Sequence, residues 1–99
     1  MFTATQARNI ANEKYNHEYY KSYRWYTSQI MRGITRAAKR GYTSFSYSLA
    51  DARKMHMTVL RQIAGELNQY GYMTNVMVNA SEDGKHKYGV LDVTWDVQG

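Results

Sequence analysis

Hydrophobic side chains recur with a helical period over the first forty residues of the chain. Thr3 and Gln6 have the spacing of a capping box, and Gly41 follows two basic residues that suit the end of a helix. A helix is therefore expected from about Ala4 to Gly41. Its roughly 36 residues would extend for about 54 Å. Because a globule of this size is narrower than that, we expect the helix either to break near Asn12–Asn16 or to project into a partner chain.

The remainder of the chain changes period three times. Strict alternation predicts strands at 42–47, 72–79 and 88–97. Between the first two, apolar residues return at helical spacing from Leu49 to Tyr70, and Ser48 with Asp51 resembles a helix cap. The dipeptide Asp83-Gly84 favours a hairpin turn between the last two strands.

These elements predict an α+β fold, in which a long N-terminal helix precedes a β-α-β-β unit with a three-stranded antiparallel sheet. The third strand is the most hydrophobic and is expected at the centre, which gives the order 1-3-2. The helix of residues 49–70 should cover one face. The expected core consists of Phe45, Tyr47, Val59, Leu60, Ile63, Leu67, Val76, Val78, Leu91, Val93 and Trp95. The side chains expected on the solvent face of the sheet are Ser44, Ser46, Asn75, Asp92 and Thr94.

Length and composition favour one small domain. The 99 residues divide into a basic, tyrosine-rich helical segment, 1–41, and a body, 42–99. The absence of cysteine excludes disulfides and thiolate metal sites. No stretch resembles a secretory leader or a membrane span, so we expect a cytoplasmic protein without a membrane partner.

Positive charge is concentrated in the N-terminal segment. The net charge is +5, and residues 1–41 hold eight Lys and Arg against Glu13 and Glu18. A negatively charged partner would therefore be drawn to the first helix.

Two opposite faces of that helix differ in chemistry. One carries a tyrosine stripe, defined here as Tyr15, Tyr19, Tyr23, Tyr26 and Ile30. A stripe at this spacing packs either on the chain's own body or on the helix of a second copy. Because phenol rings bury well while their hydroxyls need partners, we expect a homo-oligomer, a dimer or higher, held by this stripe.

The other face is basic. Its members fall within about 60° of one another around the helix. The basic face comprises Lys14, Lys21, Trp25, Arg32, Arg36 and Lys39. An indole among cations can stack on a base while the cations meet phosphate, so these six residues are the candidate ligand-binding site. The alternative is an ordinary solvated helix face.

Catalytic and metal-binding patterns are weak. His17, His56 and His86 fall in three different elements without metal-ligand spacing. Asp92 and Asp96 would lie about 13 Å apart on one strand, too far apart to act on one bond. We therefore expect no enzyme, no metal and no cofactor.

The order of elements resembles that of small bacteriophage-encoded accessory proteins. The residues that carry the resemblance are the cap at Thr3 and Gln6, the Gly71-Tyr72 step after the second helix, and Trp95 in the last strand. The resemblance implies a host-takeover or counter-defence protein, some relatives being oligomeric inhibitors of host defence or traps for nucleotide signals.

The expected function is non-catalytic binding of an anionic target. A nucleotide signal of host defence is the preferred ligand. Nucleic-acid binding through the basic face is the alternative, and direct inhibition of a host protein is a further one.

Overall fold

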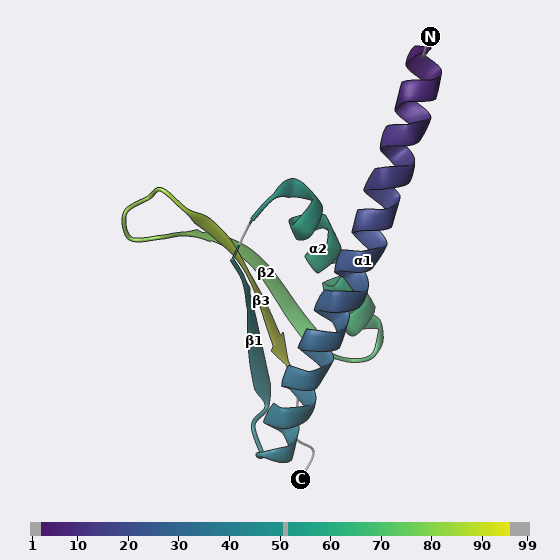
Figure 1. Ribbon diagram of the computed structural model, residues 1–99. Coiled ribbons are helices and arrows are strands. Elements are labelled where there is room, and N and C mark those ends of the chain that lie inside the picture. The colour runs from purple at the N-terminus through teal and green to yellow at the C-terminus, as the bar shows by residue number, and fades with distance from the viewer. Residues whose placement is uncertain (1–2, 51, 96–99) are drawn as a thin grey trace.

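A computed structural model describes residues 3–50 and 52–95 and confirms the expected α+β fold. A long helix, α1 (Ala4–Lys39), precedes a β-α-β-β body, as Figure 1 shows. The elements of the body are β1 (Ser44–Leu49), α2 (Lys54–Gln69), β2 (Met73–Ala80) and β3 (Lys87–Thr94). α1 is continuous through Asn12–Asn16, and its N-terminal half projects beyond the body.

Both helices end as their sequences predict. At the start of α1, the Thr3 hydroxyl accepts a hydrogen bond from the Gln6 amide, while the Gln6 side chain accepts one from the Thr3 amide. At its end Gly41 has a φ of 84°, and the Tyr42 amide donates to the Ala37 carbonyl at 2.9 Å. Gly71, with a φ of 94°, ends α2 in the same way. Glycine is needed at both positions because a side chain disfavours positive φ.

The sheet has the expected order β1-β3-β2, and all neighbours are antiparallel. Leu91 of β3 lies opposite Tyr47 on one side and Val76 on the other. The register is confirmed because Val93 is fully buried, whereas Asp92 points to the other face and accepts a hydrogen bond from Ser46. A shift of one residue would have exchanged these faces.

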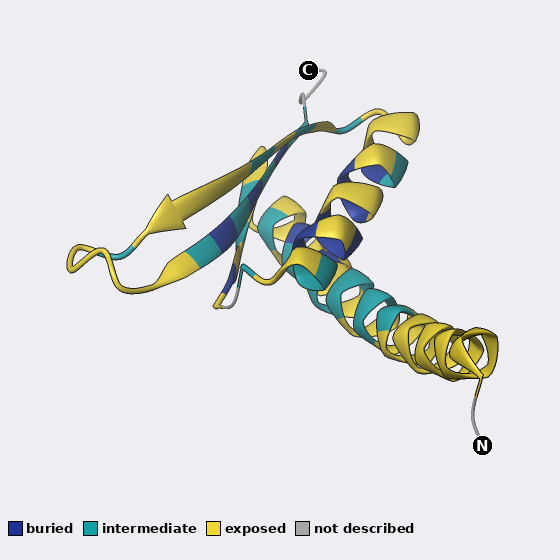
Figure 2. Ribbon diagram, turned by 90° about the horizontal axis from the view of Figure 1, so that it is seen from above, coloured by how far each residue is buried: buried dark blue, intermediate teal, exposed yellow. Residues whose placement is uncertain are grey.

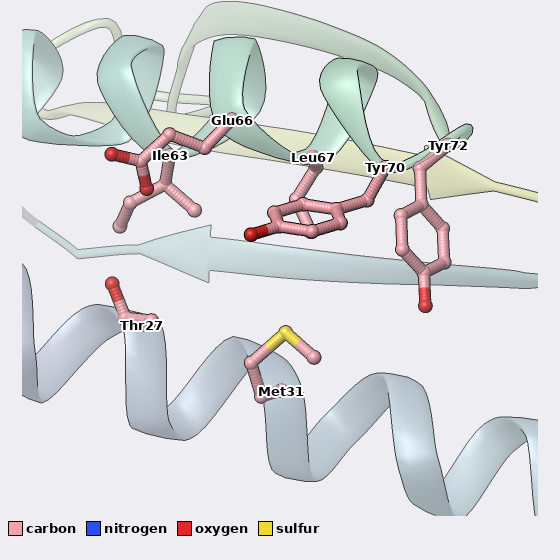
Figure 3. A pocket seen from close by; sticks show the side chains of 7 residues that line it. All are labelled: Thr27, Met31, Ile63, Glu66, Leu67, Tyr70 and Tyr72. Atoms are coloured by element: carbon pink, nitrogen blue, oxygen red, sulfur yellow. The ribbon is translucent and has the colours of Figure 1, made fainter.

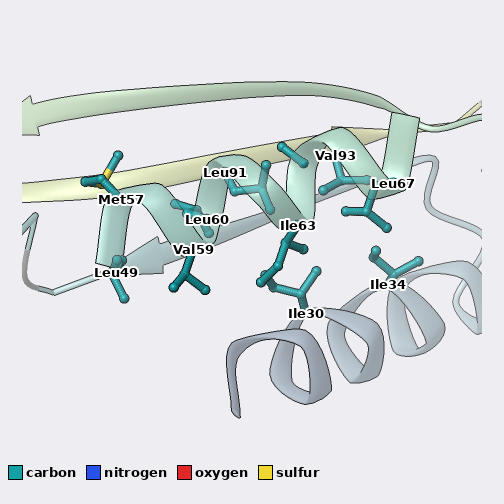
Figure 4. Packing of buried hydrophobic residues seen from close by; sticks show 11 residues of the cluster. Ile30, Ile34, Leu49, Met57, Val59, Leu60, Ile63, Leu67, Leu91 and Val93 are labelled. Atoms are coloured by element: carbon teal, nitrogen blue, oxygen red, sulfur yellow. The ribbon is translucent and has the colours of Figure 1, made fainter. Parts of the chain in front are cut away.

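The core lies between the sheet and the two helices (Figure 4). Of the expected core, Val59, Leu60, Ile63, Leu67, Leu91 and Val93 are buried, and Phe45, Tyr47, Val76 and Trp95 pack against them half-buried. Other buried side chains lie outside the list of the expected core: Ile30, Ile34, Leu49, Met57 and Ala64. The prediction for Val78 was wrong, because the hairpin extends past α2 and leaves this residue exposed.

The boundary between β1 and α2 also differs from the expectation. Leu49 is the last residue of β1 and is buried there, and Ser48 lies in the strand, so it does not cap a helix. α2 begins at Lys54 after Arg53, which makes no side-chain cap. Asp51, the other half of the expected cap, lies outside the described residues. The first strand is thus shifted two residues towards the C-terminus from 42–47.

Candidate anion-binding surface on α1

The basic face is solvent-exposed along its whole length. All six members are exposed, and they lie on the side of α1 opposite Ile30, whose side chain is fully buried against the body. From Lys14 to Lys39 the face extends for about 38 Å along the helix axis. Within residues 3–50 and 52–95 none of its five cations forms an ion pair, so their charges are available to a ligand.

Lys21 and Trp25 share a shallow hollow of about 590 Å³ on this face. Four other residues line it, His17, Tyr20, Arg24 and Ser28, and every member comes from α1. The sequence reasoning missed these four, although their spacing of three or four residues from Lys21 and Trp25 is the signal that places them beside the pair. The hollow is therefore lined by two exposed aromatic rings, Tyr20 and Trp25, and by two cations, Lys21 and Arg24.

The other members of the basic face lie outside this hollow. Lys14 borders a separate apolar hollow near the N-terminal end of α1, together with Ala7, Ile10 and Ala11. Arg32 follows Trp25 two turns later, and Arg36 and Lys39 lie one and two turns beyond Arg32 towards the C-terminal end of the helix. The surface is thus a row along one helix and does not enclose a ligand.

The tyrosine stripe explains why the basic face points outward. Three of its hydroxyls bond to side chains of α2: Tyr19 donates to Gln62, Tyr23 donates to Glu66, and Tyr26 bonds Nδ1 of His56 at 2.8 Å. These bonds run along the seam between the helices and fix the rotation of α1 about its own axis. The pKa of Tyr23 is raised, first by its hydrogen bond to Glu66 and then by burial. The pKa of Tyr19 is also raised, and here burial is the largest cause.

The stripe is therefore largely used within one chain. Ile30 is part of the core, and Tyr23 and Tyr26 are half-buried against α2, whereas Tyr15 remains 47% exposed. Packing on the chain's own body was one of the two readings of this spacing. Oligomerisation through the stripe stays a prediction, and the part of it open to a second copy is the end at Tyr15.

A second hollow lies where α1 passes the start of α2. It has a volume of about 480 Å³, and Tyr15 and Lys21 border it from α1, with Arg53 and His56 on the other side. Lys21 therefore borders both this hollow and the one beside Trp25.

An apolar cavity of about 390 Å³ separates the helices at their other end (Figure 3). Thr27 and Met31 of α1 face Ile63, Glu66 and Leu67 of α2 across it. Tyr70 and Tyr72 complete its lining. In the part of the chain that the structure describes, no cation lines this cavity, and Glu66 is negatively charged, so the cavity is unsuited to an anion.

The histidines are dispersed over the fold. The three histidines lie on α1, on α2 and in the β2–β3 turn, and the described residues hold no group of three His, Asp or Glu that could bind a metal. Among the described residues, no helix contains an apolar stretch long enough to cross a bilayer.

Fold and surface together define a small α+β protein with an exposed basic helix. Beyond that class the comparisons give no relative: the chain matches no protein-family model, no curated protein and no solved structure.

Proposed function

We propose that this protein binds nucleic acid without catalysis, using the basic face of α1. The observation that carries the proposal is the pair of exposed rings, Trp25 and Tyr20, beside Lys21 and Arg24 on one helix. Both rings are 62% exposed. Large aromatic side chains are normally covered, and a ring held among cations is suited to stack on an unpaired base.

Shape favours a polymer as the ligand. The cations are distributed along about 38 Å of one helix, which matches a chain of phosphates better than a single nucleotide. Single strands are the preferred form because their bases are free to stack on the rings. If all five cations meet phosphates, the logarithm of the affinity should fall with the logarithm of salt concentration with a slope of about −3.5.

The test is fluorescence anisotropy of labelled oligonucleotides, single-stranded and duplex, titrated at several salt concentrations. Trp25→Ala should weaken binding of the single strand about five- to hundred-fold, since base stacking contributes roughly 1–3 kcal/mol. Tyr70→Ala is the matched control, because this ring is 83% exposed but borders the apolar cavity. Equal effects of the two substitutions, or none from Trp25→Ala, would contradict the proposal.

The cations have their own test. Arg32→Gln combined with Arg36→Gln should reduce affinity and make the salt slope shallower by about 1.4, since each lost contact with a single strand removes about 0.7. The control is Lys85→Gln combined with Lys87→Gln, which changes the net charge equally in the distant hairpin (Figure 1). A slope that changes equally in both double variants would indicate only a general charge effect.

Capture of a nucleotide is the second candidate. The 480 Å³ hollow supports it, because Lys21, Arg53 and the ring of Tyr15 line it together, so that its lining holds two cations against the single carboxylate of Glu18. Mass spectrometry of the purified protein should then detect a bound nucleotide, and its binding should depend weakly on salt. In that case Trp25→Ala should leave its affinity nearly unchanged.

A further inference from the structure

β2 is an unusual edge strand. It lies at the outside of the sheet, and its eight residues include no Lys, Arg, Asp, Glu or Pro. Natural proteins usually protect a strand edge with a charge, a proline, a bulge or a covering segment. Three large apolar side chains of β2 are instead exposed: Met73, Met77 and Val78. Figure 2 shows this exposure over much of the β2–β3 hairpin.

The register identifies the backbone groups at the open edge. Ser81 donates to the carbonyl of His86 at 2.8 Å, and this pair continues the β2–β3 ladder. Because antiparallel partners bond at every second pair, the backbones of Met73, Asn75, Met77 and Asn79 face β3. The alternate residues Thr74, Val76, Val78 and Ala80 therefore direct their N–H and C=O groups outward, and among the described residues no strand pairs with them.

We propose that β2 pairs with β2 of a second copy, antiparallel and across a two-fold axis at Met77. In that register Thr74 bonds the partner's Ala80, and Val76 bonds the partner's Val78. All four outward residues of each copy are then used, which gives about eight backbone hydrogen bonds. The result is a continuous six-stranded sheet with the order β1-β3-β2-β2-β3-β1.

Side chains favour a second copy over a foreign strand. On the helix-covered face Val76 meets the partner's Val78, which covers a side chain that is 47% exposed in the single chain. On the other face Met77 meets the partner's Met77, and Asn75 meets the partner's Asn79. Two copies that each carry a charge of +5 repel one another, and the uncharged β2 places no like charges at the junction.

Two substitutions of the same kind separate this junction from any other contact. Met77→Lys places two lysines opposite each other on the axis, with their Cα atoms about 4.5 Å apart. Met73→Lys adds the same charge to the same face, but the two lysines would lie roughly 26 Å apart, because eight residues separate them along the strand. Met73→Lys is therefore the matched control.

Light scattering coupled to size exclusion measures the outcome. The wild type and Met73→Lys should have twice the chain mass of 11.5 kDa at about 100 µM. Met77→Lys should raise the dimer dissociation constant at least about tenfold, as should Met77→Glu. An equimolar mixture of these two variants should restore the dimer, because opposite charges then meet on the axis, and this restoration also shows that both variants fold.

Three results would overturn the proposal: a wild type that stays monomeric at 100 µM, equal behaviour of the Met77 and Met73 variants, or a mixture that does not associate. If the Met77 variants lose their circular dichroism, Val78→Pro replaces them. Its missing N–H points to the open edge, so the β2–β3 ladder is unaffected while the junction loses bonds. A folded Val78→Pro protein that still dimerises as the wild type does would exclude pairing through β2, and a folded monomer would support it. A dimer insensitive to all these changes would point to the tyrosine stripe.

Discussion

Replacement of Gly33 by alanine should destabilise the protein, although alanine is the better helix former. Gly33 lies inside α1 with no positive φ, so helix propensity alone predicts a gain of about 0.5–1 kcal/mol. The ring of Phe45 in β1 occupies the space that a side chain would need. A Cβ at position 33 would lie 2.7 Å from Cε1 of Phe45 and nearer still to two other ring atoms.

The magnitude follows from these two opposing effects. Forcing a group into a packed site costs about 1–3 kcal/mol, and a contact this close with an aromatic ring belongs at the upper end. Subtracting the helix gain leaves a net loss of about 2 kcal/mol. For a domain of this size the melting temperature should fall by roughly 8–16 °C.

Urea denaturation followed by circular dichroism measures this change directly. Gly65→Ala is the matched control, since Gly65 lies inside α2 and a Cβ there meets no atom within 4 Å. It should stabilise the protein by about 0.5–1 kcal/mol. On a Phe45→Ala background Gly33→Ala should also become stabilising. The reasoning is refuted if Gly33→Ala stabilises the wild type, or if its cost persists without the ring.

Three further outcomes are expected. Tyr23→Phe should lower the free energy of unfolding by about 1–2 kcal/mol in urea denaturation, because Oε2 of Glu66 loses the donor that bonds it. No change would mean that water replaces the hydroxyl at no cost. The pKa values of Tyr19, Tyr23 and Tyr47 are raised, so the folded state holds these protons more tightly than the unfolded state. These groups should leave the free energy of unfolding unaffected below about pH 10 and lower it as the pH rises further. Urea midpoints measured across the alkaline range test this. Thr3→Ala should speed amide hydrogen exchange in the first turns of α1. Because residues 4–18 are all exposed, the global free energy of unfolding should stay nearly unchanged. A global loss above about 1 kcal/mol would contradict this.

The sheet could be predicted because its signals agree with one another. Alternation in β3, the Asp83-Gly84 turn and the helical spacing of α2 all favour the same order and register. Leu49 was misplaced because one residue satisfies two periods: it continues the alternation of Phe45 and Tyr47, and it also starts the helical spacing of α2. A short segment does not contain enough residues to separate these periods.

Packing between distant elements was harder to predict. The tyrosine stripe of α1 was visible in the sequence, but the burial of each of its side chains was not. Ile30 becomes part of the core because α2 and the sheet lie over it. Val78 satisfies the strand pattern but is exposed, because α2 covers only part of β2. How far a helix reaches along a strand depends on how the two are placed in space, which the alternation of one strand does not show. The site was only partly foreseen for a similar reason. The sequence placed Trp25 off the tyrosine stripe, but the hollow that Trp25 shares with Tyr20 and Arg24 depends on side-chain conformation.

The free half of α1 also has a mechanical consequence. Residues 4–18 are exposed, and the first half-buried side chain of the helix is Tyr19, so about 22 Å of α1 extends beyond its last contact with the body. A bend of about 10° at Tyr19 would move the tip sideways by roughly 4 Å. Lys14 lies on this unsupported part whereas Arg32 and Arg36 lie where α1 packs against the body, so a bend of α1 near Tyr19 would change the spacing between the two groups of charges.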